Sequence, residues 1–253
     1  MSLLKKTIYP LIAFLLILVL WQLVVWITGV EAFLLPGPLG AAKALGEVIK
    51  SGVIFEHMGA SLFRVMVGFL AAAILAIPLG LLLGTKKYLE ITLDPILQGI
   101  RTISPISWIP LAILWFGVGN LPAMFIIFIT AFFPIMLSTA LAVRHVDPVL
   151  LKVGQNFGAS PKHMLWKIIL PAVLPYIIIG LKISLGISWV IIVAAEMVGM
   201  SSGLGYMILD ARNFLRTDLI IAGMFVVGVI GFALDRLLNI IERKVKRLVG
   251  FAN

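Results

Sequence analysis

Six apolar runs, each about 20 residues long, dominate this chain of 253 residues. A helix needs about 20 predominantly apolar residues to cross the roughly 30 Å hydrocarbon core of a bilayer. Charged or polar segments separate the runs, which cover residues 8–28, 62–84, 93–116, 121–143, 175–198 and 219–238. The pattern predicts an all-α membrane protein with six transmembrane helices in a single domain, residues 1–253. The first run is longer than a signal-peptide core and no small-residue cleavage site follows it, so we expect a retained helix.

The composition supports the same class and excludes others. Hydrophobic residues make up 62% of the chain, charged residues 12%, and the mean hydropathy is +1.16, which lies outside the range of soluble domains. With no cysteine and three scattered histidines, the sequence offers no metal constellation, and we expect no cofactor. The net charge of +9 would suggest nucleic acid in a soluble protein, but here the basic residues flank apolar runs. We therefore predict a topological role for this charge and no nucleic-acid partner.

The distribution of Lys and Arg predicts the orientation in the membrane. One side collects four basic residues, Lys43, Lys50, Arg212 and Arg216. The other side collects twelve, namely Lys5, Lys6, Lys86, Lys87, Arg144, Lys152, Lys162, Lys167, Arg243, Lys244, Lys246 and Arg247. Because cytoplasmic loops carry the excess of Lys and Arg, both termini and the loop 144–171 are predicted to be cytoplasmic.

Glycines and prolines mark three further features. Residues 39–50 form an amphipathic stretch that is too short to span, so we expect a surface helix there. Pro105 and Pro110 remove backbone hydrogen bonds in the third run, which is therefore expected to face protein or a wet cavity. The stretch "GLLLGTKK", residues 80–87, lacks the spacing and the Ser or Thr of a phosphate-binding loop. A Gly-x-x-x-Gly helix contact at Gly80 and Gly84 is the better interpretation.

The loop 144–171 carries the signals of two short helices joined at a corner. Pro148 suits the start of a helix, and Gly158 can adopt the left-handed conformation that ends one. Ser160 can cap a second helix whose first residue is Pro161. The corner is expected to expose Phe157, Ala159, Met164 and Leu165. On pattern alone, a loop lying in the lipid headgroup layer is an equally good interpretation.

The same loop resembles the cytoplasmic Glu-Ala-Ala motif of permeases in ATP-binding-cassette importers. Gly158, nine residues and then Ile168-Ile169-Leu170-Pro171 match its second half, whereas Lys152-Val153-Gly154 replace its Glu-Ala-Ala. Five more stretches are similar in family order: "LLPGP", "SLFRVMVGF", "ISPISWIPLAILWFGVG", "GLKISLGISWVIIVAAEM" and "SSGLGYMILDARNFLRTDLI". They resemble the branch that imports nitrate, bicarbonate, taurine and alkyl sulfonates. The resemblance implies a type I, MetI-like permease bundle with a coupling helix, in a prokaryotic inner membrane.

The resemblance also implies partners and a division of labour. A cytoplasmic ATPase dimer would supply ATP hydrolysis, a second permease subunit, most simply a copy of this chain, would complete the pathway, and an extracytoplasmic binding protein would deliver solute. Membrane lipid surrounds the assembly, and this chain itself has no catalytic residues. The predicted contacts with the ATPase are Gly158, Ala159, Ser160, Pro161, Met164 and Leu165.

Polar residues inside the apolar runs are the candidates for the translocation pathway. An ionisable group at a helix centre costs roughly 2.5 to 3.5 kcal/mol on insertion scales, so each needs a reason. The candidates are Arg101, Lys182, Ser184, Ser188, Trp189 and Glu196. Lys182 and Glu196 are 14 residues apart in the sequence, about 21 Å along a helix, so they cannot pair with each other. The alternative is helix packing with each charge neutralised by a neighbouring span, and for Arg64 we expect snorkelling or a carboxylate partner.

Two questions stay open at the level of sequence. The outer loop 199–214 contains Tyr206, Asp210 and Arg212, which either contact a binding protein or cap the bundle. A neutral heterocyclic solute is the alternative to a small anion. From another class, a self-sufficient secondary carrier also uses intramembrane charges and broken helices.

Overall fold

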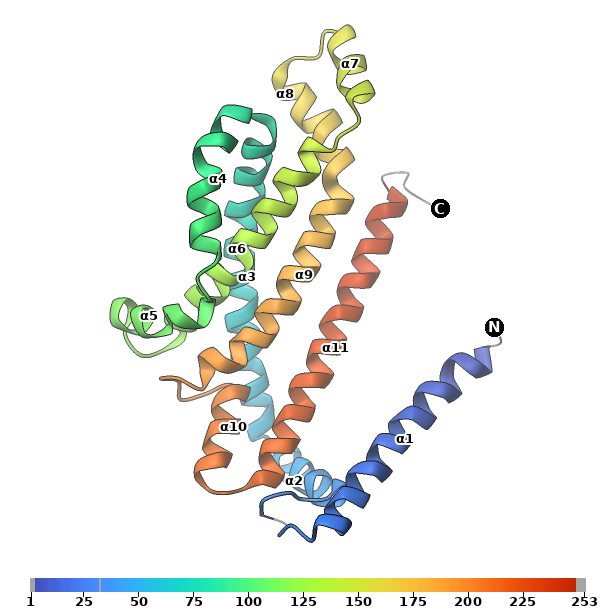
Figure 1. Cartoon of the computed structure of the whole chain (residues 1–253), viewed down its shortest axis with the longest axis vertical. Helices are drawn as coiled ribbons and strands as arrows, with labels where there is room; N and C mark the ends of the chain where they lie inside the picture. The colour runs from blue at the N-terminus through green and yellow to red at the C-terminus, as the bar shows by residue number, and fades with distance from the viewer. Residues whose placement is uncertain (1–2, 32, 249–253) are drawn as a thin grey trace.

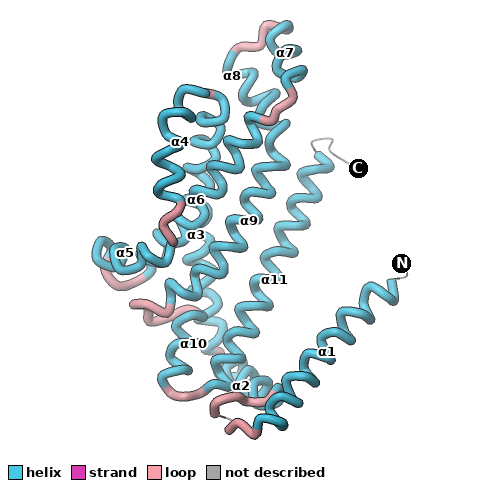
Figure 2. Tube along the Cα trace, viewed as in Figure 1, coloured by secondary structure: helices cyan, strands magenta, loops and turns pink. Residues whose placement is uncertain are grey.

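The computed structural model describes residues 3–31 and 33–248, so residues 1–2 and 249–253 of the predicted domain lie outside the described residues, as does residue 32. Throughout the described residues the regular elements are helices, joined by short loops in Figure 2. Five are long and apolar enough to cross a membrane, or six if one bent pair is counted. In chain order the elements are α1 (Leu3–Thr28), α2 (Pro38–Ser51), α3 (Val53–Thr85), α4 (Lys87–Arg101), η1 (Pro105–Trp108), α5 (Ile109–Phe116), α6 (Asn120–Arg144), α7 (Pro148–Asn156), α8 (Pro161–His163), η2 (Met164–Ile169), α9 (Leu170–Glu196), α10 (Leu204–Asn213) and α11 (Thr217–Leu248).

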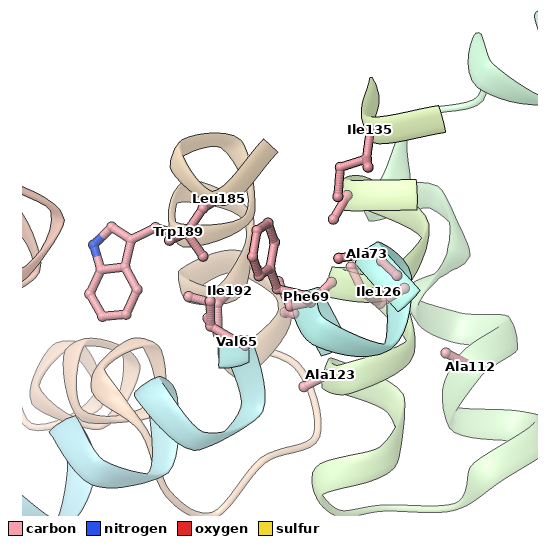
Figure 3. Packing of buried hydrophobic residues seen from close by; sticks show 14 of the residues in the cluster. Val65, Phe69, Ala73, Ala112, Ala123, Ile126, Ile135, Leu185, Trp189 and Ile192 are labelled. Carbon is pink, nitrogen blue, oxygen red and sulfur yellow. The ribbon is translucent and has the colours of Figure 1, made fainter. Parts of the chain in front are cut away.

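Helices α3, α6 and α9 form the centre of the bundle and lie side by side in Figure 1. Figure 3 shows Val65 and Phe69 of α3 beside Leu185 and Ile192 of α9, with Ile126 of α6 nearby. These side chains are buried, whereas the outward faces of the same helices carry exposed apolar residues. An apolar outer face is what lipid solvates, so this exposure agrees with a membrane-embedded bundle.

Small residues bring α3 and α6 into close contact. A Cβ on Gly80 would lie 2.5 Å from the backbone oxygen of Met136, and one on Gly84 would lie 2.5 Å from the Cβ of Val143. Both distances are too short for a side chain, so glycine is required for the approach. The predicted Gly-x-x-x-Gly helix contact is confirmed.

The predicted span over residues 93–116 is a bent pair of helices and not one continuous helix. Helix α4 ends at Arg101, and the chain resumes as η1 and α5 after a bend of 82°. Ser104, which precedes Pro105, has an extended ψ of 131°, as expected from the clash that proline imposes on the residue before it. Pro110 then sits in the first turn of α5, where its missing N–H costs nothing.

The remaining long helices are less enclosed. Helix α1 lies apart from the α3, α6 and α9 bundle in Figure 1, and none of its apolar window is buried. Helix α2 confirms the predicted surface helix, with bounds one residue wider at each end. Helix α3 begins nine residues before the predicted start at 62, and α10 was not anticipated within the loop 199–214.

Candidate functional site

The loop 144–171 folds as a helical hairpin that projects from the bundle at the top of Figure 1. Its first arm is α7, which Asp147 caps by accepting a hydrogen bond from the N–H of Val149 at 2.8 Å. Pro148 occupies the first helical position, as predicted. Local sequence therefore determines where this arm begins.

A left-handed glycine closes the first arm. The N–H of Ala159 donates to the carbonyl of Gly154 at 2.9 Å, and the N–H of Gly158 donates to that of Gln155 at 2.9 Å. This is the hydrogen-bond pattern of a Schellman motif, with Gly158 at φ 70° in the position that favours glycine. The predicted corner at Gly158 is confirmed as backbone geometry.

The second arm differs from the separate short helix that was predicted. Ser160 caps it by accepting from the N–H of His163 at 3.4 Å, with Pro161 in the first turn. The arm then runs through α8 and the π-helical η2 directly into α9 at Leu170. A displacement of the hairpin would therefore reach α9 without an intervening loop.

Gly154 holds the two arms together. A Cβ at this position would overlap the Ile168 side chain and would lie 2.9 Å from the terminal methyl carbon of Met164. Gly154 stands where the resembling motif has its second Ala, and the close packing of α7 on η2 explains the smaller residue. The same packing leaves Met164 and Leu165 half-buried, so they are less exposed than predicted.

The exposed surface of the hairpin combines aromatic and basic side chains. Phe157 at the corner is 87% exposed, and Trp166 is also exposed. Lys152, Lys162 and Lys167 are exposed around them. Trp166 was not predicted from the sequence, although its place beside Lys167 in a basic loop was a visible signal. Large apolar groups among free charges at a projecting corner are typical of a protein contact surface.

At the opposite end of the bundle, Arg64 of α3 forms a buried ion pair with Glu196 of α9. The Nη1 of Arg64 lies 2.7 Å from Oε1 of Glu196, and the two side chains are almost fully buried. Arg64 also donates to Oδ1 of Asn120 at 2.8 Å and to the carbonyl and hydroxyl oxygens of Ser202 at 2.7 Å. One guanidinium thus joins α3, the start of α6, the end of α9 and the loop before α10.

Glu196 receives further donors from the start of α10. Its Oε2 accepts from the hydroxyl of Ser61 at 2.8 Å and from the N–H of Gly205 at 3.0 Å. A Cβ on Gly203 would overlap the carboxyl group of Glu196, and one on Gly205 would overlap the backbone oxygen of Val193. The two glycines therefore let the chain pass directly over the carboxylate. We call Ser61, Arg64, Asn120, Glu196, Ser202 and Gly205 the outer polar network, where outer means the end of the bundle away from the hairpin.

A family model for the "binding-protein-dependent transport system inner membrane component" matches residues 76–247. This region contains the hairpin, α9 with Glu196 and the whole of α10. The chain belongs to this family.

Three relatives of this chain are named as permease proteins of transport or import systems. The putative aliphatic sulfonates transport permease protein SsuC of Bacillus subtilis is 39% identical over 228 residues, which cover 90% of this chain and 83% of that one. The nitrate import permease protein NrtB of Synechocystis is 37% identical over 246 residues, covering 94% and 88%. The taurine transport system permease protein TauC of Escherichia coli is 33% identical over 233 residues, covering 90% and 85%. The predicted branch is thereby confirmed.

Solved structures confirm the predicted fold class. A chain of the MetNI methionine ABC transporter, in an inward-facing conformation, superposes on the permease with a TM-score of 0.63 at 20% sequence identity. The match covers 78% of this chain and 97% of that chain. The permease therefore has the MetI-like helical fold.

The structure places Lys182 and Trp189 against α11. The Nζ of Lys182 donates to Oδ1 of Asn239 at 2.6 Å and lies 3.7 Å from Asp235 and 3.8 Å from Glu242. Trp189 is buried, and its Nε1 donates to the carbonyl of Val227 at 2.9 Å. A cleft of about 230 Å³ remains between α9 and α11, lined among others by Lys182, Gly186, Trp189 and Asp235.

The other pathway candidates divide between buried and exposed positions. Ser184 and Ser188 are fully buried in α9, and within the described part of the permease their hydroxyl groups have no hydrogen-bond partner. Arg101 is exposed at the end of α4, next to the bend. Neighbouring helices supply opposite charges to both Lys182 and Glu196, so the packing alternative describes these two residues in this structure.

Sequence reasoning identified Arg64 and Glu196 separately and offered a carboxylate partner for Arg64 as one alternative, but it did not identify the two residues as each other's partners. Three polar residues of α3, His57, Ser61 and Arg64, share one face at spacings of four and three, and His57 accepts from the N–H of Gly203 at 3.1 Å. A polar stripe on an otherwise apolar helix was the available signal. The partner of this polar stripe could not be inferred from neighbouring residues, because Glu196 lies 132 residues from Arg64 in the sequence.

Proposed function

We propose that this permease forms the translocation pathway of an ATP-driven importer for a small anion such as nitrate, bicarbonate, taurine or an alkyl sulfonate. A cytoplasmic ATPase receives the hairpin, a second copy of the chain completes the pathway, and an extracytoplasmic binding protein delivers the solute. The chain lies in a prokaryotic inner membrane with both termini in the cytoplasm. The observation that carries the proposal is the capped hairpin that projects from the bundle, exposes Phe157 and continues into α9.

The hairpin has the mechanical properties that coupling requires. Its two arms are capped, closed by a left-handed glycine and packed together at Gly154, so it transmits a displacement that a flexible linker would absorb. Because the second arm is continuous with α9, the displacement acts on a helix of the central bundle. A self-sufficient secondary carrier runs on an ion gradient alone and needs no ATPase to bind the hairpin.

Phe157 provides the direct test of coupling. In proteoliposomes that contain the permease, its ATPase and its binding protein, we expect Phe157→Ser to weaken ATPase association at least tenfold, as loss of a buried aromatic anchor does. Unfolding of the permease alone should be unchanged, because Phe157 makes no buried contact within it. Phe55→Ser, at an equally apolar exposed position of α3, is the matched control. Unaltered ATPase association in the Phe157 variant would contradict the proposal.

A single cysteine adds a positional readout, because the chain has none of its own. In Phe157→Cys, we expect a bifunctional thiol reagent to cross-link the permease to a cysteine introduced in the ATPase cleft. Phe55→Cys should give no such product. Cross-links from both sites, or from neither, would exclude a specific contact at the hairpin corner.

For the pathway we propose Lys182 and Arg101 as the residues that attract an anion. Both retain exposure, Lys182 beside the cleft between α9 and α11 and Arg101 beside the bend. Trp189 already lines this cleft, whereas Ser184 and Ser188 are fully buried and join the lining only where the helices packed on α9 move away. Lys182→Met with unchanged transport and unchanged transport-coupled ATP hydrolysis would remove the pathway role for that residue.

The solute is tested by asking which compound stimulates ATP hydrolysis. The unaltered assembly should respond to at least one of nitrate, bicarbonate, taurine and an alkyl sulfonate in the presence of the binding protein. A response to a neutral heterocycle alone would establish the alternative solute class. Transport driven by an ion gradient in the absence of ATPase and ATP would establish a secondary carrier.

A further inference from the structure

The ion pairs around Lys182 are looser than the buried pair of the outer polar network. The Nζ of Lys182 lies 3.7 Å from Oδ1 of Asp235 and 3.8 Å from Oε2 of Glu242. The Lys182 side chain is 29% exposed and that of Asp235 is 52% exposed, whereas the two side chains of the outer pair are 2.7 Å apart and 3% and 0% exposed. Solvent competes for charges that are exposed, so such ion pairs are weak. The carboxylates of α11 are therefore displaceable partners of Lys182.

Asn239 holds Asp235 beside Lys182. Its Oδ1 accepts from Nζ of Lys182 at 2.6 Å, and its Nδ2 donates to Oδ2 of Asp235 at 2.8 Å. Asp235, Asn239 and Glu242 follow one another at spacings of four and three residues, so they share one face of α11. Lys246 lies on the same face, 2.7 Å from Glu242. Two cations thus balance two carboxylates, and this group of side chains is neutral as a whole.

The cleft between α9 and α11 reaches these charges. It has a volume of about 230 Å³, and its walls include Lys182 and Gly186 of α9 and Gly231 and Asp235 of α11. Lys182 and Asp235 thus line the same cleft from opposite helices. A small anion in the cleft would be attracted by Lys182 and repelled by Asp235.

On the outer side of the cleft, the indole ring of Trp189 holds the two helices together. A Cβ on Gly231 would lie 2.9 Å from Cδ1 of Trp189, so the ring packs directly on the backbone of α11. The Nε1 of Trp189 also donates to the carbonyl of Val227 at 2.9 Å. Towards the hairpin end, the charges around Lys182 join the same two helices. Because these charges are displaceable, the segment of α11 after Gly231 is the part that a competing ligand would release.

We propose that Asp235 and Glu242 compete with the transported anion for Lys182, so that a bound anion releases this segment of α11 from α9. The inference rests on the proposed function, in which Lys182 attracts the anion, and it adds which groups oppose binding and what binding moves. Without the anion, the two carboxylates neutralise Lys182 and keep the cleft narrow. With the anion on Lys182, the carboxylates lose their counter-charge and are repelled. Anion binding and opening of the cleft are thereby coupled through exchange of one counter-charge for another.

A purely structural ion pair is the competing explanation, and the geometry argues against it. An ion pair stabilises a bundle best when it is enclosed and closely hydrogen-bonded, as at the outer end. The direct hydrogen bond of Lys182 goes to the neutral amide of Asn239 instead. The carboxylates stand farther from Lys182, beside a cleft, where an added anion can replace them.

Neutralising Asp235 separates competition from a structural role. The permease and its ATPase are placed in nanodiscs, and Leu238→Cys supplies one thiol in the lining of the cleft of a cysteine-free chain. Nitrate, bicarbonate, taurine and ethanesulfonate are added in turn, at an ionic strength fixed with sodium gluconate, while maleimide labelling of the permease is followed. We expect the transported anion to accelerate labelling at least threefold. In Asp235→Asn the half-maximal anion concentration should fall at least tenfold, because the competing charge is gone.

Three further variants make the result specific. Glu242→Gln should lower the half-maximal concentration in the same direction. Glu90→Gln is the matched control, because it neutralises the partner of Arg144 in a half-exposed ion pair elsewhere, and it should cause no change. Lys182→Met should abolish the response to the anion, and adding Asp235→Asn should not restore it.

Three results would overturn the inference. The first is an unchanged half-maximal concentration in both Asp235→Asn and Glu242→Gln. The second is a response restored by Asp235→Asn in the Lys182→Met background, because the carboxylate would then act on another charge. The third is an anion that stimulates ATP hydrolysis by the complete assembly with its binding protein but never alters labelling of the cleft. If no anion stimulates the complete assembly, the proposed function is contradicted instead.

Discussion

The two ends of the permease are stabilised in different ways. The hairpin of residues 147–169 is held by interactions between residues near in sequence, namely the side-chain caps at Asp147 and Ser160, the backbone turn at Gly158 and the packing at Gly154. The outer polar network is held by side chains from distant parts of the sequence that meet around the buried Arg64–Glu196 ion pair. The hairpin exposes the aromatic side chains of Phe157 and Trp166, whereas the network encloses its charges.

This difference agrees with a fixed arrangement of helices at one end and the proposed ATPase contact at the other. A buried ion pair is expensive to break once formed, because a single buried charge without a partner is poorly solvated. The network therefore fixes the ends of α3, α9 and α10 relative to one another. A hairpin stabilised by caps and one glycine turn can keep its shape while it is moved as a unit, which suits a contact with a separate ATPase.

The largest effect is expected from breaking the ion pair at the outer end. Glu196→Ala leaves Arg64 buried without a counter-charge, and we expect it to lower the free energy of unfolding by about 3–5 kcal/mol. Titration of the purified permease with SDS in mixed micelles measures this quantity. In the unfolded state within the micelle, Arg64 can find other partners. Such partners would make the loss in free energy of unfolding smaller, but they would not turn it into a gain.

A double variant sharpens this prediction. Arg64→Met combined with Glu196→Gln removes both charges, and the Gln carbonyl oxygen can still accept from Ser61 and Gly205. We expect it to be more stable than Glu196→Ala, because no buried charge remains unpaired. Equal instability of the two variants would show that hydrogen-bond geometry, not charge pairing, dominates the outer end.

Two left-handed glycines give the next comparison. Gly203 has φ 111° and lies against the carboxyl group of Glu196, whereas Gly158 has φ 70° and nothing within 4 Å of an added Cβ. Gly158→Ala should therefore cost only the backbone strain, about 1–2 kcal/mol. Gly203→Ala should cost about 2–4 kcal/mol, since overpacking adds to that strain. Thermal unfolding of both variants in the same detergent checks the order, and a larger loss at Gly158 would contradict it.

The same contrast explains what the sequence could reveal. Capping signals are local, so Pro148, Gly158, Ser160 and Pro161 were placed correctly, and the length of the apolar runs located five spans. A disruption near Pro105 and Pro110 was expected, but the 82° bend after Arg101 was not, because a proline removes a helical hydrogen bond without specifying the angle of the bend. A carboxylate partner for Arg64 was one of the expected alternatives, but the sequence could not identify it as Glu196, because the two residues are brought together only by packing of α3 on α9. Helix α10 was missed although Leu204, Met207, Ile208 and Ala211 follow the helical spacing i, i+3, i+4 and i+7, because a helix of 10 residues is too short to span the membrane.

A smaller effect is expected at the hairpin cap. Ser160→Ala removes the acceptor for the N–H of His163, and loss of such a cap costs about 1 kcal/mol. Because the interaction is local, hydrogen exchange should increase in residues 160–166 and stay unchanged in α10. Ser51→Ala is the control at the other end of the bundle, because the Ser51 hydroxyl donates within α2, to the carbonyl of Val48. This variant should leave hydrogen exchange in residues 160–166 unchanged. Faster exchange in α10 would show that the two ends are not independent.

The smallest effect is expected from the half-exposed ion pair at the base of the hairpin. The Nη1 of Arg144 lies 2.6 Å from Oε1 of Glu90, a shorter distance than that of the buried pair, but the two side chains are 33% and 29% exposed. Solvent offsets most of the attraction there, so Glu90→Gln should cost about 0–1 kcal/mol and less at high salt. If SDS titration gave Glu90→Gln the same loss as Glu196→Ala, then distance and not burial would set the strength of these pairs. That result would contradict the explanation given for the two ends, in which burial of the charges, and not the N–O distance, determines how much each ion pair contributes to stability.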